Sequence, residues 1–481
     1  MNYLVVLEVL GNVIKYEALV MILPFIVSLI YGGKDAYSFL ITIIIMLAVG
    51  ILMSSIKPKK KTFYAKEGFL SVAICWVVIS LFGALPFYIS GAIPSFVDCI
   101  FETVSGFTTT GATILQEVQS LPKGILFWRS FTHWIGGMGV LIFTLALMPS
   151  IGGNTIHLLK AESPGPAPEK LVPRIKQTAK IMYLIYFAMT IVQIILLLFA
   201  GMNLYDAMVH AFGTAGTGGF SNMNSSVGAY NNVYAEVIIT VFMLLFGVNF
   251  TVYFQLITGN VKQAFKNEEL KYYIGIVFLA MVVIAFNIRG LNNGSFGQSF
   301  RQSSFQVASI VTTTGYATAN FDLWPTLSKA ILALLMLTGC CAGSTGGGIK
   351  TVRIVLMFKA IKREVNRIVH PRMVNSVKLD GKVVDDESIS QVGLFIFAYV
   401  AIIVVAVLIV SIDGMDMEST ITSVFATIGN IGPGFKVVGP MGNFSSFSPL
   451  SKIVFSFCML AGRLEIYPML LMLRPSRWKR S

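Results

Sequence analysis

The sequence is poor in charge and in the residues that most often perform chemistry. Only 12% of its 481 residues are Asp, Glu, Lys or Arg, and only four are histidine. It contains no HExxH, GxSxG, Walker or dinucleotide-binding pattern, so the common hydrolase and nucleotide-dependent enzyme classes have no signature here. We therefore expect no enzyme and no cofactor in this chain. The histidines are His133, His157, His210 and His370.

Cysteine is equally scarce. The five cysteines fall mostly in apolar segments and show no CxxC spacing, so the sequence offers little prospect of a zinc site or a disulfide framework. In such segments cysteine acts as a small packing residue. The five are Cys75, Cys99, Cys340, Cys341 and Cys458.

Apolar residues, by contrast, make up most of the chain. They account for 55% of it, and the mean hydropathy is +0.76. Both values are typical of a chain that crosses a membrane several times. We expect an all-α polytopic membrane protein.

Basic residues concentrate in every second connection between the apolar segments. This is the distribution of cytoplasmic loops, and it accounts for the net charge of +13 without nucleic-acid binding. The rule places both termini in the cytoplasm and the other connections outside. The basic connections lie near residues 57–66, 160–180, 262–271, 350–382 and 474–480.

Four short polar stretches with glycine recur along the chain. They are residues 108–112 (TTTGA), 216–219 (GTGG), 312–316 (TTTGY) and 429–434 (GNIGPG). One such stretch alone is typical of an ordinary turn. Four of them between apolar segments, at spacings of 107, 97 and 117 residues, predict a fourfold internal repeat. The spacings take as equivalent Gly111, Gly218, Gly315 and Gly432.

Each stretch has the chemistry of a selectivity filter. A cation that leaves water needs other oxygen ligands, and backbone carbonyls supply them when the chain is held extended. Glycine permits that backbone, and a neighbouring threonine adds a hydroxyl acceptor. The expected cation-binding residues are Thr109, Thr110, Gly111, Thr217, Gly218, Thr313, Thr314, Gly315, Asn430, Ile431 and Gly432.

The predicted repeat is a membrane helix, a half-depth pore helix, a filter strand and a second membrane helix. Four pseudo-symmetric repeats surround one pore, after an N-terminal two-helix hairpin with a basic loop at residues 1–66. The repeats are expected at residues 67–160, 161–265, 266–385 and 386–481. A pore helix directs its partly negative C-terminal end toward the filter, which favours a cation.

The individual helices are predicted from the apolar runs. Membrane spans are expected near residues 3–30, 37–56, 68–90, 125–149, 178–201, 232–258, 272–289, 325–358, 391–412 and 449–473. Pore helices are expected near residues 95–107, 203–215, 302–312 and 416–428.

A few charged residues interrupt these segments. Asp98 and Asp206 fall in the first turn of their pore helices, where capping is the preferred interpretation over ion binding. The first span contains Glu8, Lys15 and Glu17, which form either a mutually paired set near an interface or a functional intramembrane cluster.

Residues 339–348 (GCCAGSTGGG) interrupt the second membrane helix of the third repeat. Five glycines in ten residues make a poor helix, and irregular backbone at membrane depth is tolerated where it lines a cavity. We interpret the segment as a gate below the filter; the alternative is a helix-packing surface. The gate residues are Gly339, Gly343, Ser344, Thr345, Gly346, Gly347, Gly348, Lys350 and Arg463.

Arg463 is included because it lies well inside the last predicted span. A buried arginine in a membrane helix faces a cavity or a partner. We favour a pore-facing cation that raises the barrier to permeant ions or holds the glycine-rich segment. The alternative is a structural pair with Glu465.

Four stretches together carry a family resemblance. They are residues 105–112 (SGFTTTGA), 129–139 (RSFTHWIGGMG), 341–350 (CAGSTGGGIK) and 429–434. The chain resembles the TrkH branch of the Trk/Ktr/HKT superfamily of potassium transporters over essentially its whole length. Because Gly111 is glycine where sodium-selective plant relatives have serine, the resemblance favours potassium, bound as K⁺ at the filter residues only.

The resemblance also implies a setting. It implies potassium uptake across the bacterial inner membrane by a homodimer with one pore per subunit, a gating loop, and a cytosolic nucleotide-binding ring of TrkA or KtrA type as partner. We expect contact with membrane lipid and none with nucleic acid. A symporter coupled to protons or sodium is the alternative to a channel-like pore.

Overall fold

The computed structural model is mostly helical, and it describes residues 3–56, 65–139, 175–371 and 375–473. Within these ranges, six helical segments are long and apolar enough to cross a membrane, or seven if one bent pair counts as a span. The only strands in the described ranges are β1 (Lys378–Leu379) and β2 (Lys382–Val383), which form a small antiparallel hairpin. The all-α polytopic fold is thus confirmed.

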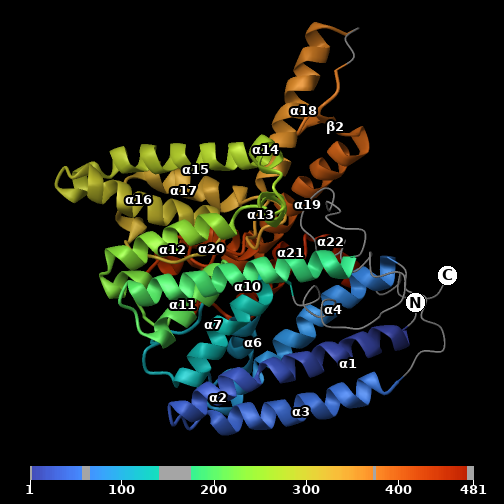
Figure 1. Cartoon of the computed structure of the whole chain (residues 1–481), viewed down its shortest axis with the longest axis vertical. Coiled ribbons are helices and arrows are strands. Elements are labelled where there is room, and N and C mark those ends of the chain that lie inside the picture. The colour runs from blue at the N-terminus through green and yellow to red at the C-terminus, as the bar shows by residue number, and fades with distance from the viewer. Residues whose placement is uncertain (1–2, 57–64, 140–174, 372–374, 474–481) are drawn as a thin grey trace.

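The helices agree closely with the predicted spans (Figure 1). The long ones are α1 (Tyr3–Val20) with α2 (Ile22–Ile30), α3 (Ala36–Ser54), α4 (Ala65–Gly83) with α5 (Leu85–Ile89), α7 (Lys123–Gly137), α10 (Ile175–Phe199), α15 (Glu268–Asn287) and α19 (Asp386–Val410). Residues 140–149 of one predicted span, and much of the basic connections at 57–66, 160–180 and 474–480, lie outside the described residues.

Four short helices occupy the positions predicted for pore helices. They are α6 (Phe96–Phe107), α11 (Leu204–Ala215), α16 (Phe296–Val311) and α20 (Met417–Ile428). The third begins six residues earlier than predicted, because Ser295 caps it. Each helix precedes one of the four glycine-bearing stretches.

All four short helices have a side-chain cap at the same position. In each, the N-cap side chain accepts a hydrogen bond from the backbone N–H three residues later, which satisfies an amide that the helix leaves unpaired. The caps are Ser95, Asn203, Ser295 and Asp416.

Asp98 and Asp206 are therefore not the caps themselves. They lie three residues after the caps Ser95 and Asn203. Asp98 forms an ion pair of 2.8 Å with Lys452. Asp206 accepts hydrogen bonds from the side-chain Nδ2 atoms of Asn203 and Asn222, both at 2.7 Å. Both carboxylates tie the helix start to its surroundings.

Of the N-terminal charges, Lys15 and Glu17 do not pair with each other. Lys15 donates to Ser54 on α3 at 3.0 Å. Glu17 is buried, and neither of its carboxyl oxygens has a hydrogen-bond partner among the described residues.

Two of the predicted long spans are broken. The 232–258 span bends by 92° between α12 (Val233–Phe246) and α13 (Phe250–Ile257). Asn249 starts the second piece by accepting the amide of Thr251 at 2.8 Å. A straight helix was wrong here, because the break accommodates the glycine-rich segment: Phe250 N–H donates to Gly343 O at 3.0 Å.

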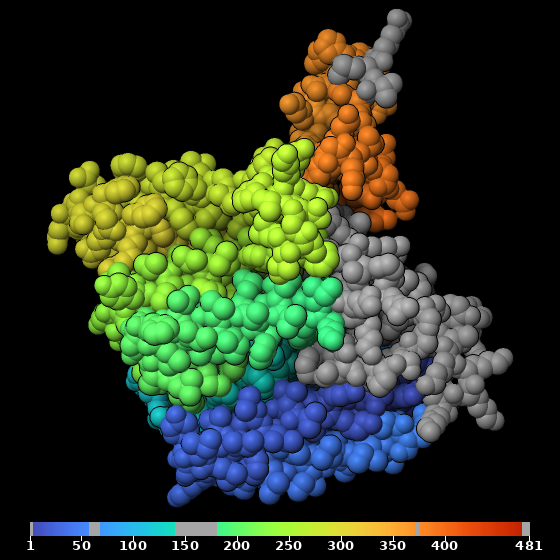
Figure 2. All heavy atoms as spheres, viewed as in Figure 1, coloured from blue at the N-terminus to red at the C-terminus, as the bar shows by residue number. Residues whose placement is uncertain are grey.

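The 325–358 span is the other broken one, as the glycines predict. It divides into α17 (Thr326–Thr338), irregular residues 339–350, and α18 (Thr351–Val369). Helix α18 projects from the body together with β1, β2 and the start of α19 (Figures 1 and 2). Its exposed side chains include Phe358, Ile361 and Ile368.

The final span also ends early. α21 (Pro449–Arg463) stops at Arg463, and α22 (Tyr467–Met472) follows after a turn in which Glu465 and Ile466 have φ of 55° and 68°. Arg463 therefore stands at a helix end, where a cation complements the helix dipole, and not inside a continuous helix.

Replacing Asp416 by alanine should destabilise the fourth short helix. Its carboxylate accepts Ser419 N–H at 2.9 Å and Ser419 Oγ–H at 2.6 Å. Losing a cap of this kind costs about 0.5–2 kcal/mol. We expect a lower melting temperature of the purified protein for Asp416→Ala and a smaller loss for Asp416→Asn, which keeps an acceptor. Equal melting temperatures for wild type and Asp416→Ala would contradict the capping role.

Candidate functional site

Each short helix ends in the same turn. The second residue after the helix has a positive φ of 54–58°, and the amide after it returns to the helix at 2.8–2.9 Å, as Thr110 N–H does to Ser105 O. This is a Schellman motif built without glycine at its left-handed position. Such backbone costs roughly 1–3 kcal/mol per residue and is kept where the surroundings impose it, often at functional sites. The four residues are Thr109, Thr217, Thr313 and Asn430.

A glycine two residues later packs against the neighbouring stretch, and the four contacts close into a ring. The glycines have φ of +77° to +98°. A methyl group on any of them would lie 1.9–2.7 Å from a carbonyl oxygen of the next stretch, so only glycine fits. The contacts join Gly111 to Gly218 O, Gly219 to Thr314 O, Gly315 to Ile431 O and Gly432 to Thr110 O.

This ring corrects the register of the second stretch. Gly219, and not Gly218, takes the place of Gly111, while Gly218 takes the place of Thr110 and contributes its carbonyl. The sequence offered two adjacent glycines and no basis for choosing between them. Gly219 is thus a residue of the ring that the sequence analysis missed.

The other predicted filter residues are brought together around the ring. All their side chains are buried, and Asn430 Nδ2 links the first and fourth stretches by donating to Thr110 Oγ1 at 2.9 Å. Thr109 Oγ1 and Asn430 Oδ1 are buried and have no hydrogen-bond partner within the described ranges. Buried oxygens are rarely left in this state, so both are available as ligands for a cation.

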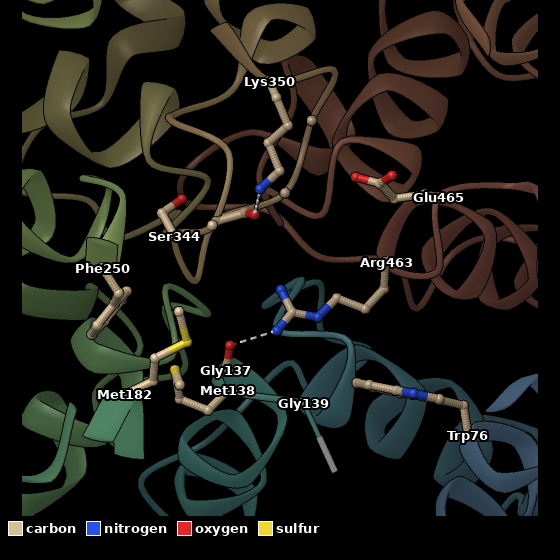
Figure 3. Close-up of a pocket in the computed structure, with 15 residues that line it drawn as sticks. Trp76, Gly137, Met138, Gly139, Met182, Phe250, Ser344, Lys350, Arg463 and Glu465 are labelled. Atoms are coloured by element: carbon tan, nitrogen blue, oxygen red, sulfur yellow. Dashed lines mark hydrogen bonds between the residues drawn. The ribbon is translucent and has the colours of Figure 1, made fainter. Parts of the chain in front are cut away.

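Two cavities are lined by the ring and by the glycine-rich segment, respectively. One is lined by a glycine from each of the four stretches, together with residues such as Gln116, Asn224 and Asn443. The other, shown in Figure 3, is lined by Gly343, Ser344, Gly346, Gly347, Gly348, Lys350, Gly462, Arg463 and Glu465, among others. The first cavity therefore opens at the ring glycines, and the second at the glycine-rich segment and Arg463.

The glycine-rich segment touches the ring directly. Gly347 N–H donates to Thr313 Oγ1 at 2.7 Å, at the strained residue of the third stretch. A methyl group on Gly347 would lie 2.5 Å from Gly429 O and 2.9 Å from Asn430 Cβ. The segment therefore lies against the third and fourth stretches at close van der Waals distance.

Two basic side chains hold this segment in place (Figure 3). Arg463 donates to Thr345 O and Gly137 O at 2.7 Å and also to Gly136 O, and Lys350 Nζ donates to Gly346 O. Glu465 pairs with Arg353 at 2.5 Å. The guanidinium of Arg463 thus bridges the glycine-rich segment and the end of α7.

A carboxylate that the sequence analysis did not select braces both ends of the segment. Glu269 Oε1 accepts Ala342 N–H at 2.7 Å and Val352 N–H at 3.0 Å. Its place at the start of a membrane helix carries no sequence signal of this role. Only the fold brings it beside residues more than 70 positions away.

These features define a class: a polytopic membrane protein in which four short helices lead into glycine-bearing stretches that meet in a ring, with an irregular segment packed against that ring. A family model described as "TrkH: Cation transport protein" matches residues 36–479. The Escherichia coli K12 Trk system potassium uptake protein TrkH is 37% identical, and the alignment covers all of both chains. The TrkG protein of the same strain is 33% identical over 99% of this chain and 98% of its own length.

A solved structure is similar over the same extent. The crystal structure of the potassium transporter TrkH from Vibrio parahaemolyticus superimposes with a TM-score of 0.89 at 33% identity, covering all of both chains. The chain belongs to the TrkH family of cation transport proteins. It is a transporter and not an enzyme.

The ring predicts that Gly219 tolerates no side chain. A methyl group there would lie 1.9 Å from Thr314 O, at a φ of +79°. We expect Gly219→Ala to lower rubidium uptake into proteoliposomes at least about tenfold, equivalent to 1.4 kcal/mol. Gly275→Ala is the matched control, because nothing lies within 4 Å of an added methyl group. Wild-type uptake by a folded Gly219→Ala variant would contradict the corrected register.

Proposed function

We propose that this protein takes up potassium through a channel-like pore whose filter is the carbonyl ring. The observation that carries the proposal is the closed set of contacts in which Gly111, Gly219, Gly315 and Gly432 each meet a carbonyl oxygen of the next stretch. Carbonyl oxygens replace the water shell of a cation. The relatives named potassium uptake proteins, 37% and 33% identical over nearly their whole length, support potassium as the ion.

The short helices add an electrostatic contribution. Each ends at the turn that leads into the ring, so the partly negative C-terminal ends of four helices approach it. The two unpartnered oxygens, Thr109 Oγ1 and Asn430 Oδ1, lie at the same turns. Cation stabilisation by dipoles and neutral oxygens requires no carboxylate in the filter.

The glycine-rich segment is proposed as the gate. It is supported by the contact of Gly347 with Thr313 Oγ1 and by the bridge from Arg463 to Thr345 O. Five glycines give the segment low helical stability, so it can rearrange more readily than the helices around it. Arg463 and Lys350 add positive charge beside the path, which raises the barrier to a cation while the gate is closed.

A coupled symporter is the second candidate. It is favoured by Glu17, a buried carboxyl group without a hydrogen-bond partner among the described residues, because intramembrane carboxyl groups commonly mark proton pathways. Glu17 lies on α1, however, and none of the ring contacts involves that helix.

The proposal includes partners and a location. We propose a homodimer in the bacterial inner membrane, with cytoplasmic termini, regulated by a cytosolic ring of TrkA or KtrA type. The names of the relatives assign them to a Trk system. The projecting helix α18, with Phe358, Ile361 and Ile368 exposed, offers an apolar surface outside the membrane-spanning body.

Proteoliposomes carrying the purified protein should take up rubidium when an inside-negative potential is imposed at symmetric pH without a sodium gradient. The potential favours entry by about 2.3 kcal/mol per 100 mV for each charge. External potassium should block the uptake, whereas sodium and choline should not. Uptake that appears only with a proton or sodium gradient would instead establish the symporter.

Deleting residues 343–348 should raise uptake in the absence of any partner protein, since it removes the proposed obstruction. Arg463→Ala should raise it less, because it frees Thr345 O but leaves the segment in place. Uptake is compared per folded, monodisperse protein. A deletion variant that folds and conducts no faster than wild type would count against the gate.

A further inference from the structure

Two of the four stretches carry a pair of threonines whose hydroxyl groups bond to each other. Thr108 Oγ1 lies 2.8 Å from Thr110 Oγ1, and Thr312 Oγ1 lies 2.8 Å from Thr314 Oγ1. The first threonine of each pair also donates to a carbonyl of its short helix at 2.6 Å. The pair therefore fixes the residue whose carbonyl belongs to the ring.

The fourth stretch fills the same space with one side chain. Gly429 and Ile431 stand at the two threonine positions. A methyl group on Gly429 would lie 2.8 Å from Ile431 Cδ1, so the isoleucine occupies the space of both threonine side chains.

The second stretch has no side chain of its own at either position. Gly216 and Gly218 stand where the threonines would be, and His133 of α7 fills the gap. The three atoms nearest to a Cβ at Gly218 all belong to the His133 ring, at 2.3–2.6 Å, and a Cβ at Gly216 would lie 2.2 Å from His133 O. The imidazole thus occupies the space of the absent second threonine, from another repeat.

Two hydrogen bonds fix the imidazole. Nδ1 lies 2.7 Å from Gly106 O, and Nε2 lies 3.2 Å from Phe220 N. The carbonyl can only accept and the amide can only donate, so both bonds require the neutral ring with its proton on Nδ1. His133 is fully buried and packs on Phe220 with ring centroids 4.2 Å apart. It joins the end of α6 to the residue after Gly219.

We infer that His133 is a positioning residue for ion selectivity, and that it acts as the missing side chain of the second filter stretch. It fixes Gly218, whose carbonyl contacts Gly111, in two ways. Its imidazole fills the space beside the Gly218 Cα, and its Nε2 accepts the Phe220 N–H. Without His133, the residue that carries the Gly218 carbonyl of the ring loses the side chain that packs against it. The inference rests on the proposed function, since it concerns the selectivity of that ring.

The test is a side-chain exchange between the two positions. Selectivity is the ratio of sodium to potassium concentrations that halve rubidium uptake into proteoliposomes. His133→Ala should lower this ratio about tenfold, equivalent to about 1.4 kcal/mol, because the Gly218 carbonyl loses the side chain that positions it. Adding Gly218→Thr to His133→Ala should restore most of the selectivity ratio, because the imidazole of His133 no longer blocks a side chain at Gly218. Gly218→Thr alone should abolish folding or uptake.

The controls separate this inference from the proposed function. A wild-type protein without potassium preference would refute the proposed function itself. A selective wild type with an equally selective His133→Ala variant would overturn the inference alone. If His133→Ala does not fold, the double variant decides: recovery of folded, selective protein supports the exchange, and a double variant no better than either single one refutes it. The exposed His370→Ala serves as the matched histidine control.

Discussion

Four contacts between a glycine and a carbonyl oxygen set the geometry of the whole centre. Each contact allows no side chain, and each fixes the position of one stretch against the next. Because the contacts close on themselves, a shift in one stretch must displace all four. The four capped short helices, their Schellman turns and the strained residues Thr109, Thr217, Thr313 and Asn430 all serve to deliver the backbone to this ring. The strain is tolerated because the packing around it leaves no alternative.

The backbone of the ring is fourfold, but its supports are not. Threonine pairs, His133 and Ile431 fill equivalent spaces by different chemistry. The surroundings of the ring are still less symmetric, since within the described ranges only the third repeat contributes a glycine-rich segment, which is braced by Glu269 and bridged by Arg463. In the proposed function, the four similar stretches set the selectivity, and the single glycine-rich segment controls the opening.

Most of the helices were predictable because apolar length and polar punctuation are local properties of the chain. The breaks were predictable only where composition signals them. Five glycines predict the irregular residues 339–350. The 92° bend at Gly247 to Asn249 and the early end of α21 have no comparable signal in the sequence. The choice between Gly218 and Gly219 depended on which one meets Thr314 O, and a contact across 95 residues leaves no trace in either local stretch.

The sequence by itself determined that this chain spans a membrane, that it carries four related glycine-bearing stretches, and that the predicted 325–358 helix is interrupted at its glycines. These conclusions follow from hydropathy, repetition and intrinsic propensity, which need no knowledge of neighbours. Tertiary structure alone decided the register of the ring, the position of Arg463 at a helix end, and the placement of His133 behind a stretch of another repeat. Those depend on close packing between segments far apart in the chain, where a difference of one residue decides which atoms meet.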